Sequence, residues 1–162
     1  MDPPPRTPPA CRISDLKKDA KSLRAGFTSE FLERADGYPG LAKKYGFRFG
    51  KAVDMEPNLM YQAVRSGQVD VISAFSTDGR IAAYNLALLE DGRHFFPPYD
   101  AAIVMRGATL DHYPEAERVL EKLSGQIDEN EMQQLNLSVD RDKRPPRDVA
   151  HDFLKLHGWP VR

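Results

Sequence analysis

Short apolar runs alternate, over the first hundred residues, with segments whose apolar positions recur every three or four residues. Arg24–Thr28, Phe47–Val53 and Val69–Phe75 have the length and composition of buried strands. The periodic segments between them predict helices. Strands that alternate with helices indicate βαβ units and a largely parallel sheet. The expected helices are Asp15–Leu23 after Ser14, a short one after Ser29 with Phe31 and Leu32, one from Pro39 to Tyr45 before Gly46, and one from Pro57 that ends at Gly67.

Two further apolar runs follow, and the pattern then becomes entirely helical. Leu86–Leu89 is a candidate strand, and Ala101–Met105 is expected to be the last one. Beyond them, three amphipathic faces predict three helices, and Asp128 with Glu131 fits a capping box for the second. Such a helical tail needs a surface to cover. The three faces are Ala116, Val119, Leu120 and Leu123; Ile127, Met132 and Leu135; and Val149, Ala150, Phe153 and Leu154.

Charge and composition exclude several classes of protein. The 162 residues include 23 Lys and Arg against 24 Asp and Glu, a formal net charge of −1. This balance argues against a nucleic-acid partner and against polybasic attachment to a membrane surface. No run approaches the roughly 18 apolar residues of a membrane span, and the proline-rich start lacks the apolar core of a secretory signal. The single cysteine, Cys11, excludes an internal disulfide and most metal–thiolate sites.

The most informative stretch is residues 69–102. Its first strand runs directly into the polar turn STDGR, residues 76–80, and it ends in an aromatic and proline corner, residues 95–99. Open α/β sheets build ligand sites at the carboxyl ends of their strands. Small hydroxyls, a carboxylate and a glycine at such a strand end therefore suggest binding rather than catalysis.

Two tyrosines stand where regular structure should break: Tyr38 in a Gly-Tyr-Pro-Gly sequence and Tyr99 after two prolines. A tyrosine on a loop at a strand end can offer its π face to a quaternary ammonium group. Taken alone, the residues favour the plainer interpretation, in which each tyrosine packs at a corner with its hydroxyl satisfied. Asp36, Asp78 and Arg80 fit equally well a contact to a polar ligand head or a role in stabilising a turn.

Enzymatic chemistry has little support in the sequence. Ser76 and Thr77 lie near Asp78, but no Gly-x-Ser-x-Gly elbow is present. The four histidines are scattered without metal-ligand spacing, and both phosphate-binding glycine motifs are missing. We therefore expect no catalytic residues, no metal site and no cofactor. An enzyme with Asp78 or His94 as its base is the least favoured alternative.

Several segments of the chain resemble one known family closely. They are GFTSEF (26–31), DGYPGL (36–41), STDGRI (76–81) and HFFPPYDAA (94–102). From about residue 13 to residue 158 the chain is similar to the osmoprotectant-type substrate-binding proteins of ABC importers. These proteins take up glycine betaine, choline, carnitine and related quaternary ammonium compounds. The resemblance implies a periplasmic-binding-protein type II fold, in which two lobes close around the ligand.

The resemblance also implies a domain organisation. Residues 1–12 are expected to be a proline-rich linker or a cloning junction. Residues 13–98 would form the second lobe, an α/β sheet flanked by helices. Residues 99–162 would form the hinge crossover and a helical C-terminal tail that packs on a first lobe. The chain lacks that first lobe, so it looks like a binding protein that is shortened, naturally or by design.

From the family we carry over only the ligand-binding positions of the second lobe. Asp100 follows the last of them, where some members have a second aromatic residue, so the ligand stays open among choline, betaines and carnitine. Half of an aromatic cage should bind weakly, because cation–π contacts are worth only about 0.5–2 kcal/mol each. The expected ligand-binding residues are Thr28, Ser29, Glu30, Asp36, Tyr38, Thr77, Asp78 and Tyr99.

The function implied by the resemblance is that of the solute-binding component of an ABC importer for quaternary ammonium osmolytes. Its expected partners are a small quaternary ammonium ligand and an ABC permease subunit. Its expected place is periplasmic, or extracytoplasmic and membrane-associated, in a full-length parent. The alternative is a shortened interaction module without a transport role, which forms a homodimer through the C-terminal helices. The tail residues expected at that interface are Val119, Leu123, Phe153 and Leu154.

Overall fold

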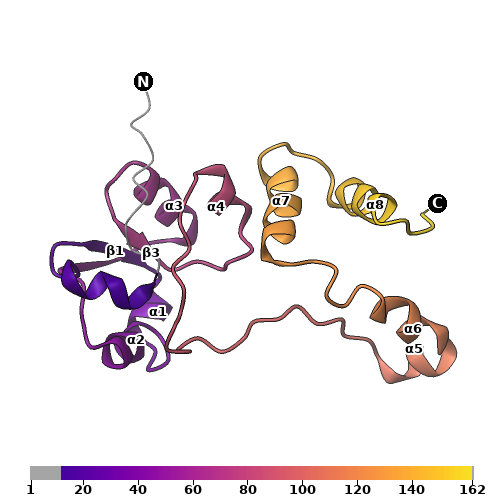
Figure 1. Ribbon diagram of the computed structural model, residues 1–162, viewed down its shortest axis with the longest axis horizontal. Helices are drawn as coiled ribbons and strands as arrows, with labels where there is room; N and C mark the ends of the chain where they lie inside the picture. The colour runs from indigo at the N-terminus through magenta and orange to yellow at the C-terminus, as the bar shows by residue number, and fades with distance from the viewer. Residues whose placement is uncertain (1–11, 162) are drawn as a thin grey trace.

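In the computed structural model, which describes residues 12–161, a small parallel sheet lies at the centre of the N-terminal half (Figure 1). Within these residues three strands pair in the order β2-β1-β3. Ala25 lies opposite Ala52 on one side and Val71 on the other. The parallel α/β arrangement is therefore confirmed, whereas the linker predicted for residues 1–12 falls almost entirely outside the described residues. The strands are β1 (Arg24–Phe27), β2 (Lys51–Asp54) and β3 (Val71–Ile72).

Helices alternate with the strands along the N-terminal half, as the periodicity predicts. One of them, α2, ends at Gly46, whose φ of 70° is a left-handed conformation that glycine adopts without strain. The caps differ from the expected ones: Arg12 rather than Ser14 precedes the first helix. Thr28 rather than Ser29 caps the next. The helices are η1 (Ile13–Lys18, a 3-10 helix), α1 (Ser29–Glu33), α2 (Tyr38–Tyr45), α3 (Pro57–Arg65) and α4 (Gly79–Ala83), the last of which was not expected.

An aromatic cluster joins β1 to the helices on one face of the sheet. Phe27 is only 2% exposed, and its ring centroid lies 5.0 Å from that of Phe31 and 5.1 Å from that of Tyr38. Phe49 completes the cluster at 6.0 Å from Phe27. Aromatic pairs of this kind contribute about 0.5–1.5 kcal/mol beyond the area that they bury. The core of the chain is therefore centred on Phe27.

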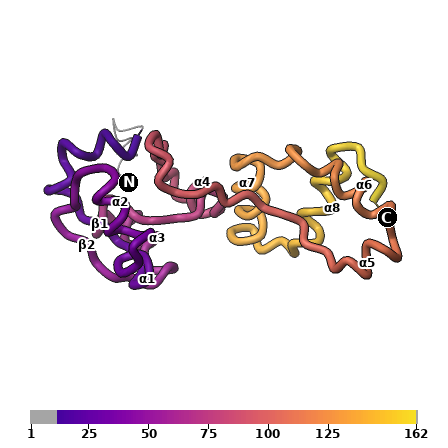
Figure 2. The backbone as a smooth tube through the Cα atoms, turned by 90° about the horizontal axis from the view of Figure 1, so that it is seen from below, coloured from indigo at the N-terminus to yellow at the C-terminus, as the bar shows by residue number. Residues whose placement is uncertain are grey.

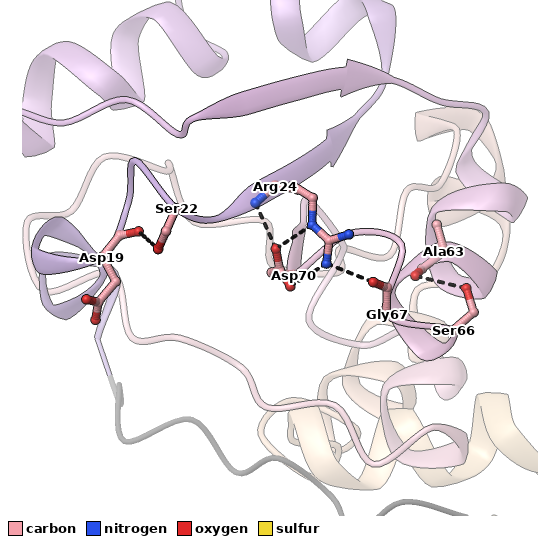
Figure 3. A network of polar contacts seen from close by, with 7 residues as sticks. All are labelled: Asp19, Ser22, Arg24, Ala63, Ser66, Gly67 and Asp70. Atoms are coloured by element: carbon pink, nitrogen blue, oxygen red, sulfur yellow. Dashed lines mark hydrogen bonds and ion pairs between the residues drawn. The ribbon is translucent and has the colours of Figure 1, made fainter.

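At the amino-terminal end of β1, a network of hydrogen bonds fixes the loop between α3 and β3 (Figure 3). The Arg24 guanidinium donates to both carboxylate oxygens of Asp70, at 2.9 and 3.0 Å, and to the carbonyl of Gly67 at 2.8 Å. The backbone N–H of Arg24 also donates to Asp70, at 2.8 Å. Side chains of the protein itself thus fasten this edge of the sheet, and the candidate site lies at the opposite edge.

Two expected strands do not form within the described residues, and β3 is shorter than expected. Leu86–Leu89 and Ala101–Met105 have no ladder partner there, and a single bridge joins Arg12 to Glu90 nearby. In the second run, Val104 is 91% exposed. An apolar run becomes a strand only where a neighbouring strand supplies hydrogen-bond partners. These predictions are wrong for the chain as it stands, because no such neighbour lies beside either run.

The C-terminal helices are reached through an extended segment and, apart from α7, lie away from the sheet (Figure 1, Figure 2). In both views α7 lies against α4. The Asp128 carboxylate accepts a hydrogen bond from the N–H of Glu131 at 2.8 Å, so the expected N-cap is confirmed. α8 packs on α7, with Val149 and Phe153 buried. The helices are α5 (Gly107–His112), which was not expected, α6 (Glu115–Glu121), α7 (Glu129–Asp140) and α8 (Pro146–Leu156).

Candidate ligand-binding site

The candidate site lies at the carboxyl-terminal edge of the sheet. Because β1 and β3 are parallel neighbours, Thr28 after β1 and the turn after β3 start from the same edge. We call residues 75–78 the strand-end turn; the N–H of Asp78 closes it by donating to the carbonyl of Phe75 at 3.1 Å. An open hollow of about 650 Å³ borders the end of β2 at this edge, but none of its lining residues is aromatic.

Asp78 and Arg80, at the end of this turn, bind each other. Asp78 caps α4 by accepting from the Arg80 N–H at 2.9 Å, and its two oxygens also accept from the guanidinium at 2.7 and 3.0 Å. The guanidinium carbon lies 3.9 Å from the centroid of the Tyr61 ring, and a guanidinium N–H donates to Asn58 at 2.9 Å. The Asp78 carboxylate, which we expected to contact a ligand, is therefore already paired.

Burial and hydrogen bonding oppose each other at Asp78. Burial alone raises the pKa of a carboxyl, but hydrogen bonds from Arg80 and from the Tyr61 hydroxyl outweigh it, and the pKa of Asp78 is lowered. Burial, reinforced by the neighbouring Asp78, raises the pKa of Tyr61 strongly. At neutral pH Asp78 is therefore ionised and Tyr61 is neutral. Asp78 and Arg80 therefore form an ion pair beside the neutral Tyr61, and none of the three residues is a free base.

The strand-end turn and the aromatic corner bring two exposed rings together. Phe75 is 71% exposed and Tyr99 is 74% exposed, and their ring centroids lie 6.2 Å apart in an edge-to-face arrangement. Tyr99 is a predicted ligand-binding residue, whereas the pattern of apolar residues predicts Phe75 inside a buried strand. The signal for Phe75 was its position directly before Ser76, because the last residue of a strand stands at the edge where ligands bind. Together the two rings form a surface suited to a soft cation.

The segment that leads to Tyr99 is attached to α2. The Tyr45 hydroxyl donates to the Asp91 carboxylate, whose other oxygen accepts from the N–H of Phe96 at 2.8 Å. The N–H of Arg93 donates in turn to the Tyr45 hydroxyl at 3.1 Å. Burial opposes ionisation of Asp91, but these hydrogen bonds lower its pKa. The corner before Tyr99 therefore starts from a fixed position on the core.

The predicted residues of α1 and the following loop form a separate surface group. Thr28 accepts a hydrogen bond from the first turn of α1 at 3.2 Å, which is a capping contact. Ser29 is exposed at the start of that helix. Glu30 and Asp36 both pair with Arg34, at 2.7 and 2.6 Å. The two carboxylates thus share one guanidinium on the surface.

Tyr38 lies in the core of the chain. It is 6% exposed, and its hydroxyl accepts a hydrogen bond from the N–H of Phe49 at 2.9 Å. Its ring also stacks on that of Phe49, at an interplanar angle of 15°. A cage residue needs an open π face, which Tyr38 does not have here. The packing role that the sequence left open for both tyrosines therefore fits Tyr38, whereas Tyr99 presents its ring to solvent.

One tail helix covers the strand-end turn. Gln133 of α7 donates its amide to the carbonyl of Ser76, and Asn136 donates to the carbonyl of Thr77 at 2.8 Å. In this chain α7 packs on the α/β unit, because its amides find acceptors at carbonyls of the turn. Packing of the tail on a first lobe stays a prediction.

In the part of the chain that the structure describes, no helix is long and apolar enough to cross a membrane. Across residues 12–161 no three His, Cys, Asp or Glu side chains lie together in a way that could hold a metal ion.

Comparison with known proteins identifies the family. Residues 6–156 match the family described as the substrate binding domain of the ABC-type glycine betaine transport system. The chain belongs to this family. Its members are substrate-binding components of transporters and not enzymes, in agreement with the lack of support for catalysis in the sequence.

Three relatives show how much of a family member the chain represents. The carnitine transport binding protein OpuCC of Listeria monocytogenes is 40% identical over 148 residues, which cover 91% of this chain and 48% of OpuCC. The ergothioneine transport permease/ergothioneine binding protein EgtU of Helicobacter pylori is 39% identical over 146 residues, which cover 90% of this chain and 26% of EgtU. A crystal structure of a glycine betaine/carnitine/choline ABC transporter matches with a TM-score of 0.86 and 43% identity, over 92% of this chain and 54% of that chain.

The chain represents only part of a family member, and its structural matches identify its fold class. The chain spans about half the length of OpuCC and about a quarter of EgtU. Its sheet flanked by helices, with a helical tail, is the periplasmic-binding-protein type II architecture that the sequence predicted, and this prediction is confirmed.

Proposed function

We propose that this chain is part of the solute receptor of an ABC importer for quaternary ammonium compounds, and that Phe75 and Tyr99 hold the cationic head. The observation that carries the proposal is the exposed pair of rings at the carboxyl edge of the sheet. A trimethylammonium group has no N–H to donate, so aromatic faces rather than hydrogen bonds recognise it. Glycine betaine, carnitine and choline all carry this group.

The polar part of the proposed site is smaller than the sequence predicted. Thr77 remains a proposed contact for the uncharged or anionic end of the ligand, because it lies in the strand-end turn two residues after Phe75. Ser29 remains one because it follows the end of β1, at the same edge of the sheet. Asp78 is left out because its carboxylate is taken up by Arg80, and Tyr38 because its ring is buried.

Two rings supply a limited affinity. At about 0.5–2 kcal/mol for each cation–π contact, the pair contributes about 1–4 kcal/mol. A Kd of 1 mM corresponds to about 4.1 kcal/mol. We therefore expect choline to bind this chain at millimolar concentrations or more weakly. A longer protein that encloses the cation should bind more tightly, because removal of water strengthens the contact.

An NMR titration of the full chain with choline tests the proposal. We expect the ring resonances of Phe75 and Tyr99 to shift with choline and much less with 3,3-dimethylbutan-1-ol, which has the same shape without the charge. Tyr99→Ala should remove the response. Tyr113→Ala is the matched control, because Tyr113 is also an exposed tyrosine but lies at the end of α5. Equal shifts with both compounds, or an unchanged response in Tyr99→Ala, would show that the rings do not recognise the cation.

The remaining parts of the proposal concern the rest of the receptor. We propose that the exposed run Ala101–Met105 packs on the part of the family fold that this chain does not span. The partner would be an ABC permease subunit, and the receptor would work on the extracytoplasmic side of the membrane. The homodimer has less support, because Phe153, one of its expected contact residues, is buried within the tail itself.

A further inference from the structure

The helix α7 contacts the strand-end turn through a polar stripe. Gln133 and Asn136 are three residues apart and so lie on the same face of the helix, which faces the carbonyls of Ser76 and Thr77. Gln133 is 6% exposed and is the buried polar residue of this helix. Buried amides are stable only when they are hydrogen-bonded. The Ser76 carbonyl thus gives the buried Gln133 amide an acceptor, and the amide gives that carbonyl a donor.

Acidic residues at the two ends of α7 interact with the turn and with Arg80. In the first turn of the helix, Glu129 accepts a hydrogen bond from the Ser76 hydroxyl at 2.6 Å. The pKa of Arg80 is raised first by its hydrogen bond to Asp78 and, more weakly, by the negative charge of Asp140 in the last turn of α7. The first turn of the helix therefore adds a hydrogen bond to those of Gln133 and Asn136.

A glycine allows the two backbones to come this close. A Cβ atom at position 79 would lie 2.5 Å from the nitrogen of Leu137 and 2.8 Å from its Cα. Only the absence of a side chain at Gly79 lets α7 approach until its amides reach the carbonyls. The glycine of the STDGR turn therefore serves contact with α7 here, not contact with a ligand.

The two hydrogen bonds act on successive peptide planes. The Ser76 carbonyl belongs to the peptide between residues 76 and 77, and the Thr77 carbonyl to the next one. A peptide plane whose oxygen is held cannot rotate, and rotation in a tight turn redirects the neighbouring side chains. Phe75 is the first residue of that turn. Its ring direction is thus set by the turn, and the turn is set by α7.

We infer that Gln133 and Asn136 are positioning residues, which fix the strand-end turn and thereby aim the ring of Phe75 at Tyr99. The relevance of this ring orientation to ligand binding rests on the proposed function, whereas the orientation itself does not. A tail helix then completes the binding surface of the second lobe without touching the ligand.

Substitutions that remove the donor and keep the shape test the inference in the full chain. Gln133→Glu and Asn136→Asp replace the amide N–H by an oxygen that repels the carbonyl. Gln134→Glu is the matched control, because it makes the same chemical change at the next, exposed position of the same helix. Because Asn136 is only half-buried, Asn136→Asp keeps the test valid if Gln133→Glu unfolds.

Two readouts report on the turn without any ligand. We expect the N–H of Asp78 to exchange with solvent about fivefold faster in either variant, as expected for a lost hydrogen bond worth about 1 kcal/mol. We also expect the NMR contact between the rings of Phe75 and Tyr99 to weaken, while the amides of β1 stay protected. The control should change neither. Unchanged exchange and an unchanged ring contact in both variants would overturn the inference.

A third readout links the turn to binding. Choline affinity should fall severalfold in Gln133→Glu and Asn136→Asp and should be unchanged in Gln134→Glu. A mobile turn with full choline affinity would overturn the positioning role. If the unmodified chain binds no choline, the proposed function fails, while amide exchange and the ring contact still decide the inference.

Discussion

The helices α2 and α7 are attached to the same α/β unit by opposite kinds of contact. α2 buries Tyr38 and Tyr45 in an apolar cluster with β1. α7 donates the amides of Gln133 and Asn136 to backbone carbonyls and comes close where Gly79 has no side chain. Apolar burial is strong but has no direction, whereas hydrogen bonds are weaker and directional. The first attachment therefore sets how stable the unit is, and the second sets where the strand-end turn points.

The largest expected effect is the loss of the apolar attachment. Phe27→Ala should lower the free energy of unfolding by about 3–5 kcal/mol, because it leaves a cavity among packed rings. Chemical denaturation of the full chain measures this change. Phe75→Ala is the matched control and should cost less than about 0.5 kcal/mol, because its ring is exposed. A similar cost at both positions would mean that Phe75 is packed and that the exposed pair does not exist.

A smaller effect should follow from forcing α7 away from the turn. Gly79→Ala places a methyl group 2.5 Å from the backbone of Leu137, so the helix must move, at a cost of about 1–3 kcal/mol. Gly107→Ala is the control, because no atom lies within 4 Å of an added Cβ there. Denaturation gives the cost, and amide exchange of the strand-end turn shows whether α7 has separated. If Gly79→Ala changes neither, the close approach of α7 is not a feature of the folded chain.

The apolar attachment could be predicted from the sequence, and the reason is local. Strand β1 and helix α2 are short, have clear apolar positions and are bounded by Thr28 and Gly46. The apolar pattern of each segment predicts its secondary structure, and the rule that βαβ units form parallel sheets predicts how the segments are arranged. Phe27 and Tyr38 then meet in the core, with ring centroids 5.1 Å apart, because only the short helix α1 and its loop separate β1 from α2 in the chain.

The polar attachment could not be predicted in this way. A search for apolar periodicity in α7 selects Met132 and Leu135, whereas the contacts to the turn use Gln133 and Asn136. The partners of these amides are backbone carbonyls, which leave no mark in the sequence. The predicted strand before the turn also extends too far, to Phe75, because where a strand ends depends on its neighbours and not only on its own residues.

A pH-dependent test concerns the ion pair of Asp78 with Arg80 at the end of the strand-end turn. Asp78→Asn should cost about 1–2 kcal/mol at neutral pH, because it weakens the hydrogen bonds to Arg80. The pKa of Asp78 is lowered by folding, so its ionised form stabilises the fold above the unfolded value of about 3.9, and this contribution is lost as pH falls through the folded value. The difference from the unmodified chain should therefore shrink below about pH 4.

Denaturation between pH 7 and pH 3 measures this difference. Asp111→Asn, on the exposed surface of α5, is the control and should change the free energy of unfolding by less than about 0.5 kcal/mol. A cost of Asp78→Asn that stays constant down to the lowest pH would mean that the charge of Asp78 does not hold the end of the turn.

The smallest effect is expected in the run Ala101–Met105, which within residues 12–161 is neither buried in an apolar cluster nor held by hydrogen bonds like those of α7. Val104 is 91% exposed, so Val104→Ser should change the free energy of unfolding by less than about 0.5 kcal/mol at any protein concentration. This near-absence of effect is informative, because an apolar side chain that is packed loses transfer energy when it becomes polar. A cost above about 1 kcal/mol that grows with protein concentration would show that the run Ala101–Met105 is covered by a second copy. A cost independent of concentration would show that it folds back on its own chain. Only the unchanged value agrees with a strip left open for the part of the family fold that this chain does not span.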